Sequence, residues 1–106
     1  MIFPSDAAEA ERQGALLLDV REAEEWEAGH APGAVHLPLD AVTDAAPSFR
    51  GQQVLTVCRS GGRSARAAKA RAAAGVDVRD VAGGMTAWAG AGLPVIRDDG
   101  TPGEVI

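Results

Sequence analysis

The sequence contains one cysteine, Cys58, and the residues around it indicate a nucleophile. Cys58 directly follows the apolar run Val54–Val57. The segment that it opens reads Cys58-Arg59-Ser60-Gly61-Gly62-Arg63-Ser64. The two glycines let the backbone curl without side-chain clashes, and successive N–H groups in such a curl form an anion-binding nest. The two arginines add full positive charge, so we expect the pKa of Cys58 below its ordinary value of about 8.5.

The charge distribution along the chain supports an anion site around Cys58. Residues 48–75 carry six basic and no acidic residues, although the chain as a whole has a net charge of −5. Residues 1–47 carry ten acidic and two basic residues. The alternative interpretation is a helix with a solvated basic face, which charge alone favours. A second alternative makes Cys58 a buried, inert hydrophobe, as most free cysteines are.

The elements that must position this loop alternate between short apolar runs and helical segments. Strands are expected at Leu16–Val20, Ala34–Leu37, Val54–Val57 and Val78–Val81, with a short edge strand at Met1–Phe3. Helices are expected from an N-cap at Ser5 to Gln13, and over Glu22–Ala28, Ala41–Ala46, Arg63–Ala74 and Met85–Ala89. This alternation predicts an α/β fold with a mostly parallel sheet covered by helices on both faces. A strand then delivers Cys58 to the carboxyl edge of the sheet, where open α/β sheets bind ligands.

Length and composition limit the remaining options. The 106 residues fit one domain, 1–106, large enough to bury its own core. One cysteine excludes an internal disulfide and a four-cysteine zinc site, and neither a metal nor a cofactor is expected. No signal sequence or membrane-length apolar run is present, so the expected location is the cytoplasm, without membrane contact. The acidic balance argues against nucleic-acid binding.

Three segments give the sequence its resemblance to the rhodanese family of sulfurtransferase domains. The first is Leu18-Asp19-Val20-Arg21 with Glu25-Trp26, Gly29-His30, Pro32-Gly33-Ala34 and Leu37-Pro38. The second is the Cys58–Ser64 loop. The third is Gly83-Gly84-Met85 with Trp88 and Gly92-Leu93-Pro94-Val95. They stand in family order and span residues 18–95.

The resemblance implies a single rhodanese-like domain, doubly wound around a central parallel sheet of about five strands. It also implies a reaction in which Cys58 takes sulfane sulfur from thiosulfate or a persulfide donor. The resulting Cys58 persulfide passes its sulfur to cyanide, a thiol or a protein thiol. The substrate-binding residues implied are Arg59, Ser60, Gly61, Gly62, Arg63 and Ser64.

The flanking motifs are interpreted as structural. Trp26 and Trp88 are expected in the core, and Arg21 is expected to pair with Glu25. Gly29, Gly33, Gly83 and Gly84 are expected to serve turns or close packing. His30 and His36 are also expected to be structural, with a Cys–His dyad as a minor alternative.

Other functions of the same loop remain open. Related phosphatases place five residues between cysteine and arginine, whereas four separate Cys58 from Arg63, which favours a single sulfur over a phosphate group. Arsenate reduction usually needs a resolving thiol, and the chain has no second cysteine. Inactive binding modules of the family typically lack the loop cysteine. A sulfur-carrier role uses the same residues, so the sequence does not separate it from thiosulfate turnover.

Overall fold

The structure is a computed structural model that describes residues 1–38, 53–60 and 78–106. Its elements alternate between helix and strand over much of the described chain. In chain order they are α1 (Pro4–Arg12), β1 (Leu16–Asp19), α2 (Ala23–Ala28), β2 (Val35–His36), β3 (Val54–Val57), β4 (Val78–Asp80) and α5 (Gly84–Gly90). The helices expected at Ala41–Ala46 and Arg63–Ala74 lie outside the described residues.

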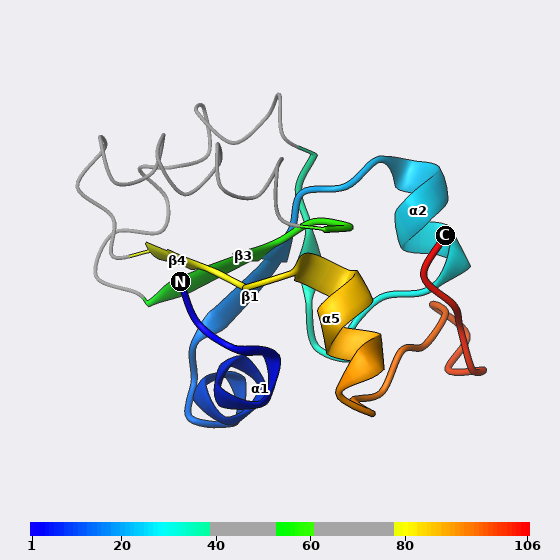
Figure 1. Ribbon diagram of the computed structural model, residues 1–106. Coiled ribbons are helices and arrows are strands. Elements are labelled where there is room, and N and C mark those ends of the chain that lie inside the picture. Colours follow the sequence, from blue (N-terminus) through cyan, green and yellow to red (C-terminus); the bar gives the residue numbers. More distant parts are fainter. Residues whose placement is uncertain (39–52, 61–77) are drawn as a thin grey trace.

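The strands form one parallel sheet in the order β2-β1-β3-β4 (Figure 1). β1 pairs in parallel with both β2 and β3, so the chain leaves β1 for one edge and returns on its other side. β1 and β3 are almost entirely buried, as their mainly apolar sequences predict. The α/β class and the parallel sheet are therefore confirmed. A further pairing joins Ile2 to Val81 in parallel as a single bridge, at the position of the expected edge strand.

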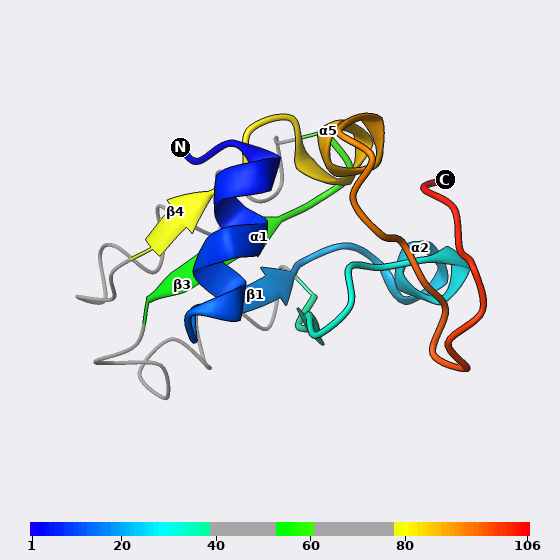
Figure 2. The ribbon, with the colours of Figure 1, turned by 90° about the horizontal axis from the view of Figure 1, so that it is seen from below.

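Helices α1 and α5 pack on the same face of the sheet (Figure 2). The core between them and the sheet is built mainly from apolar side chains of β1, β3 and α5. Its largest buried members are Leu17, Leu55, Val57, Met85 and Trp88. The Trp88 indole N–H also donates to the Pro94 carbonyl oxygen at 2.8 Å, so this buried ring has its polar atom satisfied.

Two local predictions at helices are wrong. Helix α1 begins at Pro4 with Phe3 at the N-cap, and the Ser5 side chain does not cap it. Proline suits the first helical position because its fixed φ is already helical and it has no N–H to satisfy. Trp26 is only half-buried and lies outside the core, because α2 has six residues and packs none of them fully.

The segment after α5 folds back as a hairpin, which is absent from the elements expected from the sequence. Ile96 pairs antiparallel with both His30 and Pro102, and the Glu104 N–H donates to the Ala28 carbonyl oxygen at 3.0 Å. The close approach depends on Gly29 and Gly103. A Cβ on Gly103 would lie 2.7 Å from the Gly29 Cα, which is closer than real Cβ atoms come. The hairpin is therefore fixed to the end of α2 by backbone contacts.

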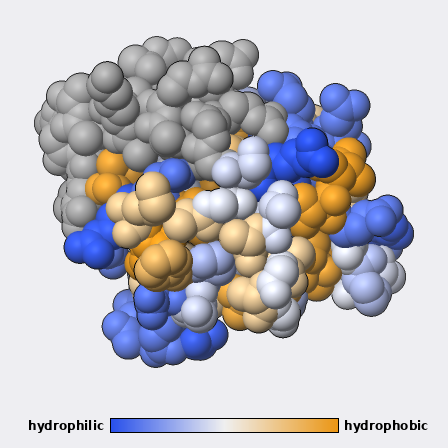
Figure 3. Space-filling view, viewed as in Figure 1, coloured by the Kyte–Doolittle hydropathy of each residue, from blue (hydrophilic) through white to orange (hydrophobic). Residues whose placement is uncertain are grey.

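The surface mixes apolar and hydrophilic side chains. Figure 3 shows apolar side chains at several separate places on one face, with hydrophilic ones between them. The exposed large apolar residues include Met1 and Phe3 near the amino terminus. Among the described residues, no helix is long and apolar enough to cross a membrane.

Candidate active site

Cys58 lies directly after the carboxyl end of β3, where the sequence places it. Its side chain is buried, with 1% of its surface exposed, and packs with Val20 and Leu37. The Val20 N–H donates to the Val57 carbonyl oxygen at 3.0 Å, which extends the β1–β3 pairing to the residue before Cys58. The thiol is thus fixed at the centre of the sheet edge, in surroundings that are partly apolar.

The backbone of Cys58 and Arg59 is held by the first turn of α5. The Met85 N–H donates to the Cys58 carbonyl oxygen at 2.7 Å, and the Thr86 N–H donates to the Arg59 carbonyl oxygen at 2.9 Å. These N–H groups belong to the turn that has no partners within its own helix, so each bond satisfies a donor that the helix leaves open. The loop that begins at Cys58 therefore has its first two residues fixed against α5.

Gly84 makes this arrangement sterically feasible. A Cβ there would collide with the Cys58 carbonyl oxygen and lie 2.8 Å from the Arg59 carbonyl carbon. Gly83 and Gly84 also have φ values of 72° and 59°, in the left-handed region that favours glycine. The expectation of turns and close packing is confirmed for both glycines. The sequence did not indicate that the close contact is with the cysteine itself.

The predicted substrate-binding residues divide into two groups. The side chains of Arg59 and Ser60 are exposed and follow Cys58 at the edge of the sheet. The remaining residues lie outside the described part of the chain, namely Gly61, Gly62, Arg63 and Ser64. The amide cradle that these residues are expected to form remains a prediction.

A buried ion pair supports the same edge of the sheet. The Arg21 guanidinium donates to the Asp19 carboxylate at 2.7 Å and 2.9 Å, and both side chains are fully buried. It also donates to the Gly29 carbonyl oxygen at 2.8 Å. The expected pairing of Arg21 with Glu25 is therefore wrong. Glu25 instead completes a capping box with Glu22 at the start of α2.

The two histidines make structural contacts, as expected. His30 lies 2.9 Å from the Asp98 carboxylate through Nε2, and the His36 Nε2 lies 2.7 Å from the Arg21 carbonyl oxygen. Trp26 stacks on both rings, at 3.7 Å from His30 and 5.1 Å from His36 between ring centroids. This stack gives the half-buried Trp26 ring its partners outside the core.

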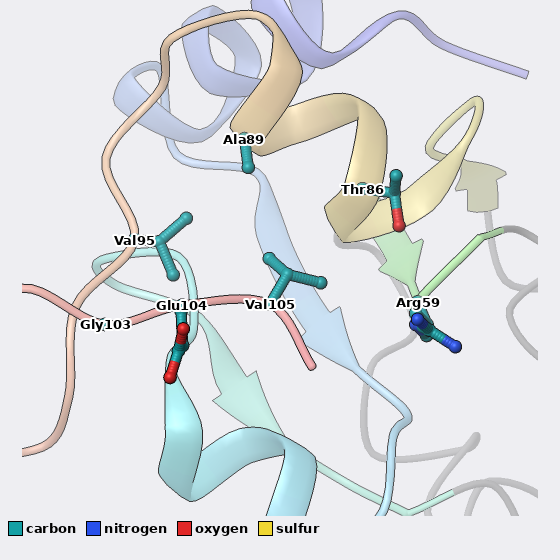
Figure 4. Close-up of a pocket in the computed structure, with 7 residues that line it drawn as sticks. All are labelled: Arg59, Thr86, Ala89, Val95, Gly103, Glu104 and Val105. Atoms are coloured by element: carbon teal, nitrogen blue, oxygen red, sulfur yellow. The ribbon is translucent and has the colours of Figure 1, made fainter.

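A pocket of about 460 Å³ lies between α5 and the C-terminal hairpin (Figure 4). One side is formed by Arg59 together with the helix residues Thr86 and Ala89. The other side comes from the hairpin, through Val95, Gly103, Glu104 and Val105. The sequence patterns did not predict these hairpin residues, although the Asp99-Gly100 pair is a turn signal that marks the hairpin. The described residues contain no cluster of His, Cys, Asp and Glu that could hold a metal ion.

Comparison with known proteins identifies the family. The Rhodanese-like domain matches residues 4–91. Thiosulfate sulfurtransferase GlpE of Pseudomonas savastanoi pv. phaseolicola is 35% identical over 89 residues, which cover 82% of this chain and 84% of that protein. The chain therefore belongs to the rhodanese family.

Solved structures agree with this assignment. A rhodanese-related protein from Thermoplasma volcanium superposes with a TM-score of 0.82 at 28% identity, covering 90% of this chain and 95% of that one. A further relative is YrkF of Bacillus subtilis, named as a candidate sulfur carrier and 41% identical over 76 residues. That match covers 70% of this chain and 41% of YrkF, so the chain spans less than half of that relative.

Proposed function

We propose that the protein is a sulfurtransferase of the thiosulfate sulfurtransferase type, with Cys58 as its catalytic nucleophile. The proposal rests on one observation above all. The only cysteine stands at the carboxyl end of a central strand, and the α5 amides hold its carbonyl group and that of Arg59. A fixed backbone next to a nucleophile lowers the cost of reaching the reactive geometry. The sulfurtransferase and sulfur-carrier relatives support the same chemistry.

The reaction has two steps that share the cysteine sulfur. The Cys58 thiolate attacks the outer sulfur of thiosulfate, the S–S bond of the donor breaks, and sulfite leaves with the electron pair. A nucleophilic acceptor, cyanide or a thiol, then attacks the outer sulfur of the Cys58 persulfide. The new bond forms to the acceptor, and the electron pair returns to the Cys58 sulfur as a thiolate. A persulfide donor replaces thiosulfate in the first step without changing the second.

Positive charge and backbone donors assist both steps in this proposal. Arg59 forms no ion pair within the described residues, so its guanidinium can attract the donor dianion. In this proposal, backbone N–H groups of the loop bind the persulfide and its negative charge. They belong to Arg59, Ser60, Gly61, Gly62, Arg63 and Ser64. No cofactor or metal takes part, and the proposed setting is the reducing cytoplasm.

Mass spectrometry of the intact protein tests the proposal directly. Thiosulfate should add one sulfur atom to the wild type, cyanide should remove it, and Cys58→Ser should add none. A sulfur-carrier protein would take up sulfur from a persulfide donor and turn over thiosulfate slowly. If the wild type gains sulfur from neither donor but cleaves a phosphoryl substrate or reduces arsenate, the proposed function is wrong.

A further inference from the structure

The pocket between α5 and the hairpin lies on the face of the sheet opposite to the Cys58 thiol. Side chains alternate between the two faces along a strand, and Val57 belongs to the core cluster that also contains the buried side chains of α5. Cys58, the next residue, packs in a separate cluster with Val20. Val95 and Val105 line the pocket and pack against the first cluster. A ligand in this pocket is therefore separate from the thiol.

The pocket has the size and the walls of a small-molecule site. Its volume of about 460 Å³ lies within the range of roughly 300–1,000 Å³ that ligand pockets occupy. Figure 4 shows the side chains of Ala89, Val95 and Val105 around it, from α5 and the hairpin. The Gly103 N–H donates to the Val95 carbonyl oxygen at 2.9 Å, so the two arms of the hairpin are fixed to each other. The apolar wall is thus an ordered part of this fold.

The hairpin wall lies outside the part of the chain that matches the family. The match ends at residue 91, whereas the lining residues at 95 and 103–105 all follow it. The family assignment therefore leaves the ligand of this pocket open, and the lining itself must indicate the ligand's chemistry.

One end of the pocket is polar and positively charged. Arg59 lines this end and forms no ion pair within the described residues. The Thr86 N–H donates to the Arg59 carbonyl oxygen at 2.9 Å, which holds the two residues together. Figure 4 shows the Thr86 hydroxyl oxygen on the side of Arg59. A guanidinium beside a hydroxyl offers a carboxylate both charged and neutral hydrogen-bond donors, so this end favours an anion.

The hairpin carries the opposite charge. Glu104 lines the pocket, and its carboxylate lies on the opposite side of its segment from the Val105 side chain (Figure 4). Its negative charge and the apolar walls disfavour a second anionic group away from Arg59. Charge complementarity therefore favours a ligand with one negative charge, at Arg59, and an apolar body.

We propose that this pocket binds an aliphatic monocarboxylate, with its carboxylate at Arg59 and Thr86 and its hydrocarbon chain between α5 and the hairpin. Each methylene group buried against Val95 and Val105 favours binding. Thiosulfate has no carbon body and gains nothing from these walls. Because the site is separate from the Cys58 thiol, the inference does not depend on the proposed function.

Isothermal titration calorimetry of the full chain, without any sulfur donor, tests the ligand class. Unbranched carboxylates of four to seven carbons should bind with a Kd that falls about three- to fourfold per methylene group. Hexanoate should have a Kd of about 1 mM, which suits a ligand of its size. Hexanamide has the same shape without the charge, and adipate adds a second carboxylate at the far end. Both should bind about fivefold more weakly than hexanoate.

Substitutions in the two parts of the lining test the location. Ala89→Leu fills the pocket from α5 and should raise the Kd of hexanoate at least tenfold. Ala91→Leu is the matched control, because both alanines are exposed and Ala91 does not line the pocket. Arg59→Met should remove the preference for hexanoate over hexanamide. Cys58→Ser should bind hexanoate as the wild type does.

Four results would overturn the inference. They are no saturable binding of the carboxylate series, equal binding of hexanoate and hexanamide, wild-type affinity in Ala89→Leu, and loss of hexanoate binding in a folded Cys58→Ser variant. The last result would place the carboxylate at the thiol instead. Sulfur uptake, measured separately by mass spectrometry, decides the proposed function, so the failure of either proposal is distinguishable from the failure of the other.

Discussion

Two close backbone contacts in this domain both depend on glycine, but they position different parts of the molecule. Gly84 brings the first turn of α5 against the carbonyl groups of Cys58 and Arg59. Gly29 and Gly103 bring the C-terminal hairpin against the end of α2. The first contact satisfies helix N–H groups with loop carbonyls, while the second joins two extended segments that are remote in sequence. The first therefore fixes the backbone at the nucleophile, and the second builds one wall of the pocket that Arg59 also lines.

The Asp19–Arg21 pair is fully buried and bonds the Gly29 carbonyl oxygen at the second contact, so its loss should have the largest effect. Arg21→Met leaves the Asp19 carboxylate buried without its partner and removes the bond to the Gly29 carbonyl oxygen. We expect a loss of about 3–5 kcal/mol in the free energy of unfolding, measured by urea denaturation. The double variant Asp19→Asn/Arg21→Met should recover part of this loss. No recovery would show that the guanidinium acts by packing rather than by charge.

Gly84→Ala should have the next largest effect, because its Cβ meets backbone atoms of both Cys58 and Arg59. We expect destabilisation of about 3 kcal/mol and a loss of persulfide formation at temperatures where the variant remains folded. Gly92→Ala is the matched control, since Gly92 has a φ of 77° but a methyl group added there would have no neighbouring atom within 4 Å. Equal destabilisation of the two variants would assign the effect to backbone conformation alone.

Gly103→Ala should separate the hairpin contact from the active-site contact. Its methyl group would meet the Gly29 Cα and the Ala28 carbonyl oxygen, so the hairpin must shift. We expect a loss of about 1–2 kcal/mol, with sulfur uptake from thiosulfate retained. Gly90→Ala, where the added methyl group meets nothing, provides the control. If Gly103→Ala abolishes sulfur uptake, the hairpin contact is not independent of the active-site contact.

Glu11→Gln should have the smallest effect, and its sign depends on pH. Burial raises the pKa of the Glu11 carboxyl above its ordinary value of 4.5, although Arg12 opposes the shift. The charged form is therefore less favourable in the folded state, and stability falls as the pH rises through the raised pKa. Glu11→Gln should be more stable than the wild type at neutral pH, and this gain should disappear below about pH 4.

Glu9→Gln is the control for this prediction, because its shift has the opposite sign. Hydrogen bonding and charge from Arg12 lower the pKa of the exposed Glu9. The charged Glu9 is favoured in the folded state, so its substitution should slightly reduce stability at neutral pH and have no effect in acid. Thermal unfolding curves at pH 3 and pH 7 measure both variants.

Local sequence patterns predicted the parts of the fold that depend on local properties. The mainly apolar runs at Leu16–Val20 and Val54–Val57 predicted the central strands, and the latter placed Cys58 at the sheet edge. The start of α1 was predicted too late in the chain because Ser5 is a good cap, whereas Pro4 fits the first helical position. Whether the helix begins at Pro4 or after a Ser5 cap depends on the neighbouring segments, which the local sequence does not contain.

The contacts that shape the site could not be predicted in the same way. The sequence predicted a turn or close packing at Gly84 but not which backbone it meets, and Gly103 was not singled out. Trp26 stacks on His36, which reaches it only after the chain has turned back into β2. Each of these contacts joins segments whose approach depends on the complete fold.

The position of Trp26 gives the domain an optical signal of its own. The chain has two tryptophans and no tyrosine, so its near-ultraviolet emission comes from Trp26 and Trp88. Trp88 is 2% exposed in the core and should emit at shorter wavelength until the whole domain unfolds. Trp26 stacks on His30, whose ring contacts Asp98 in the hairpin. Its fluorescence should therefore report local release of the hairpin while the Trp88 signal remains unchanged.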